Sequence, residues 1–355
     1  MANARSLRVL DTGVVEGCLN IATGQAIIEA HQQGKSPDTL RFLRFPPTAL
    51  VGRHQALGQE INLEFCTAHD IGVVRRITGG GAIFLDPGQL GWELALDRRT
   101  LGISSLPELT RTICEAAADG ISRLGIEARY RPRNDIEVDG RKISGTGGFF
   151  DGNTLFFQGT VLVDMNPQLM VSALRVPRAK LEKRDLDSAQ RRVVTLRELM
   201  GDHAPSLPEI QLALTEAFCE HFGLQAQAGD LDPTEKQWAQ AFLEEEIGTA
   251  DFIHGVDEPE KARGLLRGQC TSAGGTITVY LRLEGPAQNR IREALITGDF
   301  FVTPPRIIFD LESRLRGVFL EELETVIQTF FNHSNIEVLS ISPDDLLTAI
   351  RDALE

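Results

Sequence analysis

Residues 75–86 read Arg75-Arg76-Ile77-Thr78-Gly79-Gly80-Gly81-Ala82-Ile83-Phe84-Leu85-Asp86. Three consecutive glycines follow two arginines and lead into an apolar run. Glycine has no Cβ, so a ligand can lie directly against this backbone, and successive N–H groups can form a concavity for an anion. The guanidinium groups add permanent charge that suits carboxylate and phosphate. The stretch therefore indicates either an anion site or, most simply, a tight turn between two strands.

A second cluster lies further along the chain and reads Arg133-Asn134-Asp135-Ile136-Glu137-Val138-Asp139-Gly140-Arg141-Lys142-Ile143-Ser144-Gly145-Thr146-Gly147-Gly148. The Asp139-Gly140 pair predicts a hairpin turn, which puts Lys142 on the second strand beside glycines. Most strand lysines are simply solvated, but glycine neighbours also let a phosphate approach this point charge. Asp135 is a candidate Mg²⁺ ligand or the start of an Asx turn.

Bulk properties exclude several classes of function. The chain has 355 residues, a formal net charge of -14 and a pI of about 5.1, which opposes broad attachment to nucleic acid or to an anionic membrane. We expect no signal peptide and no membrane span, because no apolar stretch is long enough. The five cysteines are dispersed and form no C-x-x-C pair, which predicts reduced thiols in a cytoplasmic protein.

Hydrophobic periodicity predicts an α+β fold with helices packed on a mixed sheet. We expect helices over 15–32, 106–124, 207–222, 234–247, 286–296, 318–331 and 343–354. We expect strands over 73–76, 276–283 and 307–309, and a strand over 82–85 that pairs with 73–76 across the glycines. The change in composition after His254-Gly255 predicts a large domain over 1–255, a linker over 256–265 and a small domain over 266–355.

Taken in order along the chain, these motifs resemble the lipoate–protein ligases of the biotin and lipoate ligase superfamily. The resemblance covers about residues 7–225, and residues beyond 265 resemble, more loosely, the small C-terminal domain of two-domain ligases. The matching segments are residues 19–22, 51–55, 75–84, 133–138, 141–145, 159–162, 180–181 and 192–196.

The resemblance implies a two-step reaction, in which lipoate and ATP with Mg²⁺ give lipoyl-AMP and a lysine of an acceptor lipoyl protein then takes the lipoyl group. Lys142 would be the catalytic residue, bridging the lipoyl carbonyl and the α-phosphate. Asp135 would hold Mg²⁺. The residues implied to bind ATP or lipoyl-AMP are Arg75, Arg76, Gly79, Gly80, Gly81, Ala82, Ile83, Phe84, Asn134, Asp135, Lys142, Gly145, Thr160 and Lys180.

An apolar tunnel for the lipoyl tail is also implied. Its candidate lining residues are His54, Val74, Phe149 and Phe157, although packing in the core is the simpler interpretation of each one taken singly. The sequence leaves open the choice between lipoate and octanoate and the identity of the acceptor. The basic residues that we expect to hold the adenylate or to dock the acceptor are Arg175, Arg178, Lys180, Lys183, Arg184, Arg191 and Arg192.

Two positions depart from the usual ligase pattern: Leu85 and Gln158 each stand where the family carries a histidine. These departures put the geometry of the pocket and the choice of acceptor in doubt. One alternative is an octanoyltransferase of the same fold that works without ATP, although no cysteine lies near Lys142 to form a thioester. Another is a non-catalytic protein that binds lipoyl proteins, against which the retained Lys142 argues.

Overall fold

The protein is described here from a computed structural model. The structure describes residues 5–102, 105–175, 192–259, 264–272, 274–333, 337–338 and 341–355. Helices and strands alternate irregularly along the chain, which gives the α+β fold that the sequence predicts.

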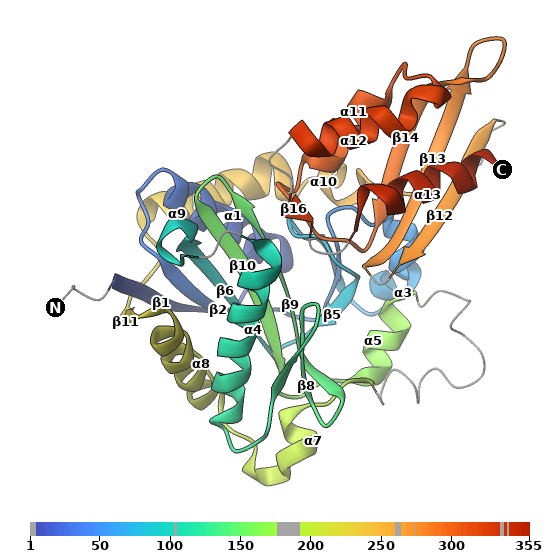
Figure 1. Ribbon diagram of the computed structural model, residues 1–355. Helices are drawn as coiled ribbons and strands as arrows, with labels where there is room; N and C mark the ends of the chain where they lie inside the picture. The colour runs from blue at the N-terminus through green and yellow to red at the C-terminus, as the bar shows by residue number, and fades with distance from the viewer. Residues whose placement is uncertain are drawn as a thin grey trace.

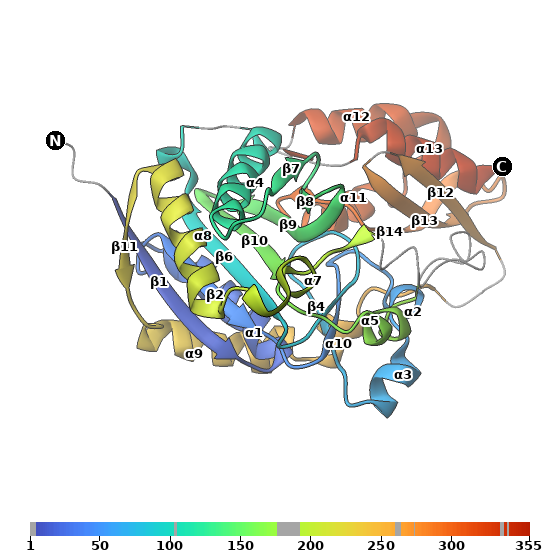
Figure 2. The same cartoon turned by 90° about the horizontal axis from the view of Figure 1, so that it is seen from below.

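The centre of the larger part of the molecule is a mixed sheet, which has eight strands among the described residues (Figures 1 and 2). In spatial order they are β11 (Leu224–Ala228), β1 (Arg5–Val14), β2 (Thr39–Arg44), β6 (Gln89–Asp97), β10 (Thr154–Leu162), β9 (Arg141–Asp151), β8 (Asp135–Val138) and β7 (Arg129–Arg131). The pairs of β1 with β11 and β2 are parallel, and the other pairs are antiparallel. The predicted turn at Asp139-Gly140 is confirmed as the hairpin that joins β8 to β9, and a second hairpin, at Gly152, joins β9 to β10.

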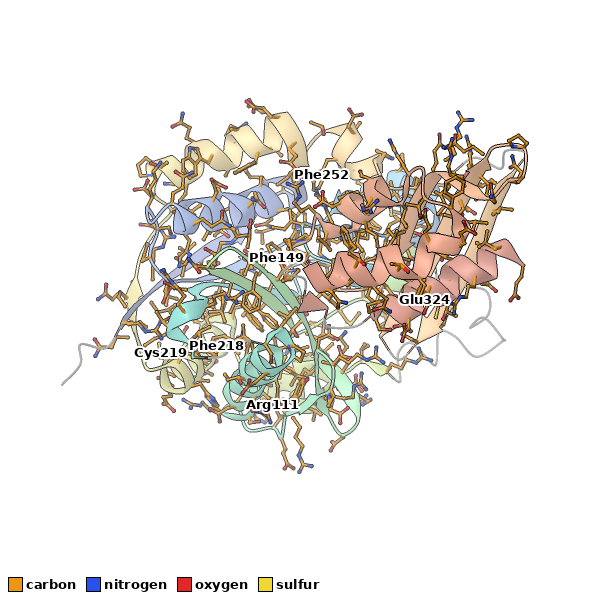
Figure 3. All side chains as sticks on the ribbon, turned by 45° about the horizontal axis from the view of Figure 1, so that its top comes forward. Arg111, Phe149, Phe218, Cys219, Phe252 and Glu324 are labelled. Carbon is orange, nitrogen blue, oxygen red and sulfur yellow. The ribbon has the colours of Figure 1, made fainter. Side chains whose placement is uncertain are left out.

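Helices cover both faces of this sheet. Helices α4 (Leu106–Ser122) and α8 (Leu207–Phe222) pack on one face, and α1 (Gly17–Gln32), α9 (Pro233–Phe242) and the π-helical segment η4 (Leu243–Ile247) pack on the other. Side chains alternate along β9, so Phe149 joins the core under α1 while Phe150 joins the core under α4 and α8. Figure 3 shows Phe149 in the interior and Phe218 on α8.

Short elements complete the larger part of the molecule. They are α2 (Leu57–Glu60), α3 (Leu63–Ala68), α5 (Pro167–Ala173), α7 (Leu196–Met200), α10 (Ala250–His254), η1 (Arg98–Thr100) and η3 (Gly201–His203). A small sheet carries the triple glycine. Its central strand β3 (Thr48–Val51) pairs with both β4 (Gly72–Arg75) and β5 (Ile83–Leu85). The predicted pairing of 82–85 with 73–76 is therefore wrong: the glycine loop crosses the end of β3 to join its two neighbours.

The C-terminal part has its own antiparallel sheet and its own core, formed by apolar residues between 277 and 353. Its elements are β12 (Leu265–Ser272), β13 (Gly275–Glu284), β14 (Arg290–Gly298), β15 (Val302–Thr303), α11 (Ile307–Leu315), η5 (Leu320–Glu322), α12 (Leu323–His333), β16 (Glu337–Val338) and α13 (Pro343–Leu354). This confirms a small C-terminal domain beside the larger one (Figure 1). The boundaries proposed for the linker, 256–265, stay a prediction.

Two predicted elements of this domain are wrong. The expected helix over 286–296 is a turn followed by β14, because Ile291 and Ile296 are buried against β13 on a strand that contains a bulge. The expected strand over 307–309 is the start of α11, where Ile307, Ile308 and Leu311 bury at helical spacing. Short apolar runs do not by themselves distinguish a strand from a helix.

Candidate functional site

Lys142 and Asp135 are brought together by the β8–β9 hairpin. Asp135 pairs with Gly145 and Glu137 with Lys142, with a register shift between Ile136 and Glu137. This bulge gives β9 one extra residue, so Lys142 and Gly145 lie on the same side of the strand although they are three residues apart. The Lys142 Nζ reaches Asp135 Oδ1 at 2.7 Å. A Cβ on Gly145 would lie 2.7 Å from that Nζ, so a side chain there would displace the ammonium from this position.

Asp135 has two cationic partners. Its Oδ2 accepts a hydrogen bond from Arg131 Nη2 at 2.5 Å, on the far side from Lys142. Burial raises the pKa of Asp135, but the charges and hydrogen bonds of Lys142 and Arg131 outweigh burial and hold this pKa below its usual value. The carboxylate therefore stays ionised and keeps the Lys142 ammonium in a defined position. About a third of the lysine side chain remains exposed.

The glycine loop is shaped from behind by Arg76. The guanidinium of Arg76 is buried and donates to the carbonyl oxygens of Gly79 at 3.0 Å and Gly81 at 2.9 Å. Burial, and then the charge of Arg75, lower the pKa of Arg76 to about 10, which leaves it cationic at neutral pH. Arg76 thus fixes the loop and supplies positive charge next to it.

A single cavity of about 440 Å³ joins the glycine loop to the hairpin lysine. Twelve of the residues predicted to bind the nucleotide or the adenylate line it: Arg76, Gly79, Gly80, Gly81, Ala82, Ile83, Phe84, Asn134, Asp135, Lys142, Gly145 and Thr160. Segments distant in sequence therefore converge on one space, as the two motifs together predict.

Arg75, a further candidate for the nucleotide site, lies away from this cavity. Arg75 is buried, and its guanidinium donates to the backbone carbonyl oxygens of residues 52, 53, 55, 252, 253 and 256. Burial, and then the charge of Arg53, lower the pKa of Arg75 to about 10. Arg75 therefore ties α10 and the chain after it to the loop before α2, a structural role. Lys180 and the basic residues between 178 and 191 lie outside the described residues.

The four candidates for the lipoyl tunnel pack in cores or at the domain junction. Val74 and Phe149 belong to the core under α1, and Phe157 belongs to the core under α4 and α8. His54 is buried at the contact between the two domains, where its ring stacks on Phe300 at 5.3 Å between centroids. Core packing, the simpler interpretation of each, is the arrangement that the structure shows.

The cavity is lined instead by apolar residues that sequence reasoning missed. Ile21 of α1, Leu43 and Phe45 at the end of β2, and Leu50 of β3 form part of its wall. The strands below add Glu93 of β6 and Gln158 of β10. Two of these carry a signal in the sequence: Gln158 departs from the family pattern, and Glu93 interrupts the apolar run of β6.

The C-terminal domain contributes another part of the wall. Phe300 O accepts a hydrogen bond from Gly80 N at 3.1 Å, and Asp299 and Phe301 line the cavity. A Cβ at Gly79 would lie 2.1 Å from Phe300 O, and one at Gly147 would lie 2.3 Å from the ring of Phe301. These glycines therefore admit the neighbouring domain as well as any ligand, which no local pattern indicates.

The cysteines of the chain lie outside the lining of this cavity. All five cysteines are described, none lines the cavity, and burial raises the pKa of each, for Cys114 to about 12. Within the described ranges, no group of three or more His, Cys, Asp or Glu side chains is placed to hold a metal ion.

Comparison with known proteins places the chain among its relatives. The sequence model of the lipoyl protein ligase A/B catalytic domain matches residues 17–219, more than half of the chain. The chain belongs to this family. It is 28% identical over 261 residues to the octanoyltransferase LipM of Kyrpidia tusciae, which covers 66% of this chain and 94% of LipM. It is 34% identical over 163 residues to the lipoate-protein ligase LplJ of Bacillus subtilis, which covers 46% of this chain and 48% of LplJ.

Solved structures of family members share the fold. P. falciparum LipL1 in complex with lipoate has a TM-score of 0.70 at 18% identity and covers 94% of this chain and 96% of its own. A bipartite lipoate protein ligase from Thermoplasma acidophilum has a TM-score of 0.63 at 24% identity and covers 73% of this chain and all of its own. In the part of the chain that the structure describes, no helix is long and apolar enough to cross a membrane.

Proposed function

We propose that this chain is an ATP-dependent lipoate–protein ligase. The observation that carries the proposal is that the Lys142 ammonium and the glycine loop open into the same cavity. A cation beside a bare backbone suits a ligand with a phosphate and an acyl carbonyl close together, as in lipoyl-AMP. The family's ligases and an ATP-bound ligase structure of the same fold support this choice.

In the first step, a carboxylate oxygen of lipoate forms a bond to the α-phosphorus of ATP, and the bond from that phosphorus to pyrophosphate breaks. Both reactants are anionic, so positioning them against their repulsion is the main catalytic requirement. Lys142 would bridge the carboxylate and the α-phosphate, and Arg76 would lower the repulsion from behind the loop. Mg²⁺ would take most of its ligands from phosphate and water, with Asp135 as its protein ligand.

In the second step, the amine of an acceptor lysine attacks the carbonyl carbon of the mixed anhydride. The bond to the phosphate oxygen breaks, AMP leaves with the electron pair, and the amine loses a proton. Lys142 would stabilise the negative charge on the tetrahedral oxygen, so one side chain serves both steps. We propose an acceptor of the lipoyl-domain class. Arg175, whose Nη1 already donates to Gly58 O, is a described member of the basic segment proposed to dock it.

A second candidate is octanoyl transfer between carrier proteins without ATP, favoured by the similarity to LipM over almost all of that protein. A thioester route would need a thiolate at the cavity, whereas burial raises the pKa of every cysteine thiol.

The experiment is lipoate-dependent ATP–pyrophosphate exchange by the full chain, set beside transfer from an octanoyl carrier protein without nucleotide. We expect exchange, followed by a mass increase of an added lipoyl domain. ATP-free transfer with no exchange would support the second candidate.

A further inference from the structure

A row of polar side chains crosses the sheet beneath the cavity. Gly147 of β9 lies opposite Gln158 of β10, which lies opposite Glu93 of β6, which lies opposite Arg41 of β2. Residues directly opposite each other in adjacent strands share one face, so the row faces α1 and the cavity together. Glu93 and Gln158 line the cavity, whereas Arg41 lies behind them.

The charges of this row are deeply buried. Glu93 is 5% exposed and Arg41 is 1% exposed. Both Nε and Nη2 of Arg41 donate to the same oxygen of Glu93, Oε2, at 2.9 and 2.5 Å. Among the described residues, no donor forms a hydrogen bond to Glu93 Oε1. Within the same residues, the buried Arg41 Nη1 donates no hydrogen bond. A pocket that only had to hold a hydrocarbon chain would gain nothing from a bare carboxylate oxygen in its wall.

The row lies at the far end of the cavity from the reacting group. The Nζ of Lys142 lies over Gly145, two residues from Gly147 along β9. Strand spacings put Glu93 about 10 Å across the sheet and about 7 Å along it, hence roughly 12 Å from the ammonium. That separation is comparable with the reach of a medium-length acyl chain. If the carboxyl end lies at Lys142, the opposite end of the chain lies at Glu93.

We propose that Glu93 is a specificity-determining residue that selects acyl acids with a hydrogen-bond donor at the far end, and that the reduced, dithiol form of lipoate is the favoured member. This rests on the proposed function. A thiol S–H donates to the free Oε1, whereas the terminal methyl of octanoate leaves that oxygen desolvated and unpaired. A site that hydrogen-bonds its substrate rejects the analogue without the polar group more strongly than an apolar pocket distinguishes a methylene. Gln158 is held beside Glu93 by its bond to Thr78 Oγ1 at 2.8 Å.

The test is calorimetric binding of dihydrolipoate, lipoate and octanoate to the full chain without ATP. Octanoate is titrated both with and without the reductant that keeps dihydrolipoate in its dithiol form. The wild type is expected to bind dihydrolipoate at least about tenfold more tightly than octanoate, with lipoate between them. In the double variant Arg41→Met/Glu93→Leu, which replaces the pair by apolar side chains, the ratio should fall to within about threefold. This fall in the ratio should come mainly from tighter binding of octanoate.

A remote pair supplies the matched control. Arg8 and Glu235 form an ion pair at 2.6 Å between β1 and α9, away from the cavity lining. Arg8→Met/Glu235→Leu should leave the ratio unchanged. If the Arg41/Glu93 double variant does not fold, Glu93→Gln keeps the shape and a bond to Arg41 and should lower the ratio about threefold.

Equal binding of the three acids by the wild type, binding of none of them, or an unchanged ratio in the Arg41→Met/Glu93→Leu and Glu93→Gln variants would overturn the inference. Because no nucleotide takes part, this result is independent of ATP–pyrophosphate exchange. A chain that fails to exchange but discriminates through Glu93 would keep this inference and lose the ligase proposal.

Discussion

Two ion pairs stand at the two ends of one cavity and differ in almost every physical respect. Lys142 and Asp135 lie at its hairpin end, with side chains 34% and 18% exposed. Arg41 and Glu93 lie at its sheet end, with side chains 1% and 6% exposed. Where water reaches a pair, an ammonium can exchange its carboxylate partner for an incoming anion at little cost. Where water is excluded, neither partner can leave without stranding the other charge. The first pair suits chemistry and the second suits recognition.

Removing the exposed cation gives the largest expected effect on activity. Lys142→Ala should lower lipoate-dependent pyrophosphate exchange by about 10³-fold or more, because the ammonium acts on charge that develops in the transition state. The free energy of unfolding should change by less than about 1 kcal/mol, because the pair is partly solvated. Arg141→Ala is the matched control: Arg141 is the adjacent residue and pairs with Glu198, and it is absent from the cavity lining. Comparable loss in both variants would remove the special role of Lys142.

Breaking the buried pair should act on stability instead. Glu93→Leu leaves Arg41 without its partner and should lower the free energy of unfolding by about 3–5 kcal/mol in denaturant titrations. The double variant Arg41→Met/Glu93→Leu should recover most of that loss, because no charge remains buried. Equal destabilisation by the single and double variants would show that packing, rather than the unpaired charge, accounts for the loss.

The contact between the two domains contains a buried histidine, His54, that is neutral rather than paired with an opposite charge. Burial first, then the charges of Arg53 and Arg75, lower the pKa of His54 to about 3 from 6.5. The folded chain binds fewer protons here than the unfolded chain between these values, so stability is lost as pH falls below about 6.5. Between pH 7 and pH 5 the wild type should lose about 2 kcal/mol more than His54→Phe, which keeps a ring against Phe300. Parallel pH profiles of the two proteins would contradict this.

The smallest effect is expected at the partner of Lys142. Asp135→Asn keeps the shape of the side chain but removes the charge that positions the ammonium, and should lower pyrophosphate exchange about tenfold. The unfolding free energy should change by less than about 1 kcal/mol. A change in activity as large as that of Lys142→Ala would mean that Asp135 takes part directly, as the proposed Mg²⁺ ligand. An unchanged rate of pyrophosphate exchange would show that Asp135 neither positions the ammonium nor takes part directly.

The sequence predicted the hairpin end of this cavity better than the sheet end. Lys142, Asp135 and the glycines stand in local motifs. Such a motif can be recognised in the sequence because its functional residues and its turn lie within a few residues of each other. Glu93 and Arg41 are in contact only because β2 and β6 are neighbours in the sheet. The local sequence of neither strand indicates that order. Arg75, adjacent to Arg76 in the sequence, serves the fold for another reason: alternation along the chain sends the two guanidinium groups to different sides. Phe301 reaches the glycine loop through contacts between domains, for which no local pattern exists.

The most direct test of the account is calorimetric binding of a non-hydrolysable lipoyl-adenylate analogue, such as the acyl-sulfamate, to the wild type and to Lys142→Ala. We expect the substitution to weaken binding by about 100-fold, because the ammonium is the cation that faces both the acyl and the phosphate positions. Arg141→Ala should weaken it less than about threefold. Equal affinity of Lys142→Ala and the wild type would contradict the claim that the exposed pair exchanges its carboxylate for the acyl phosphate.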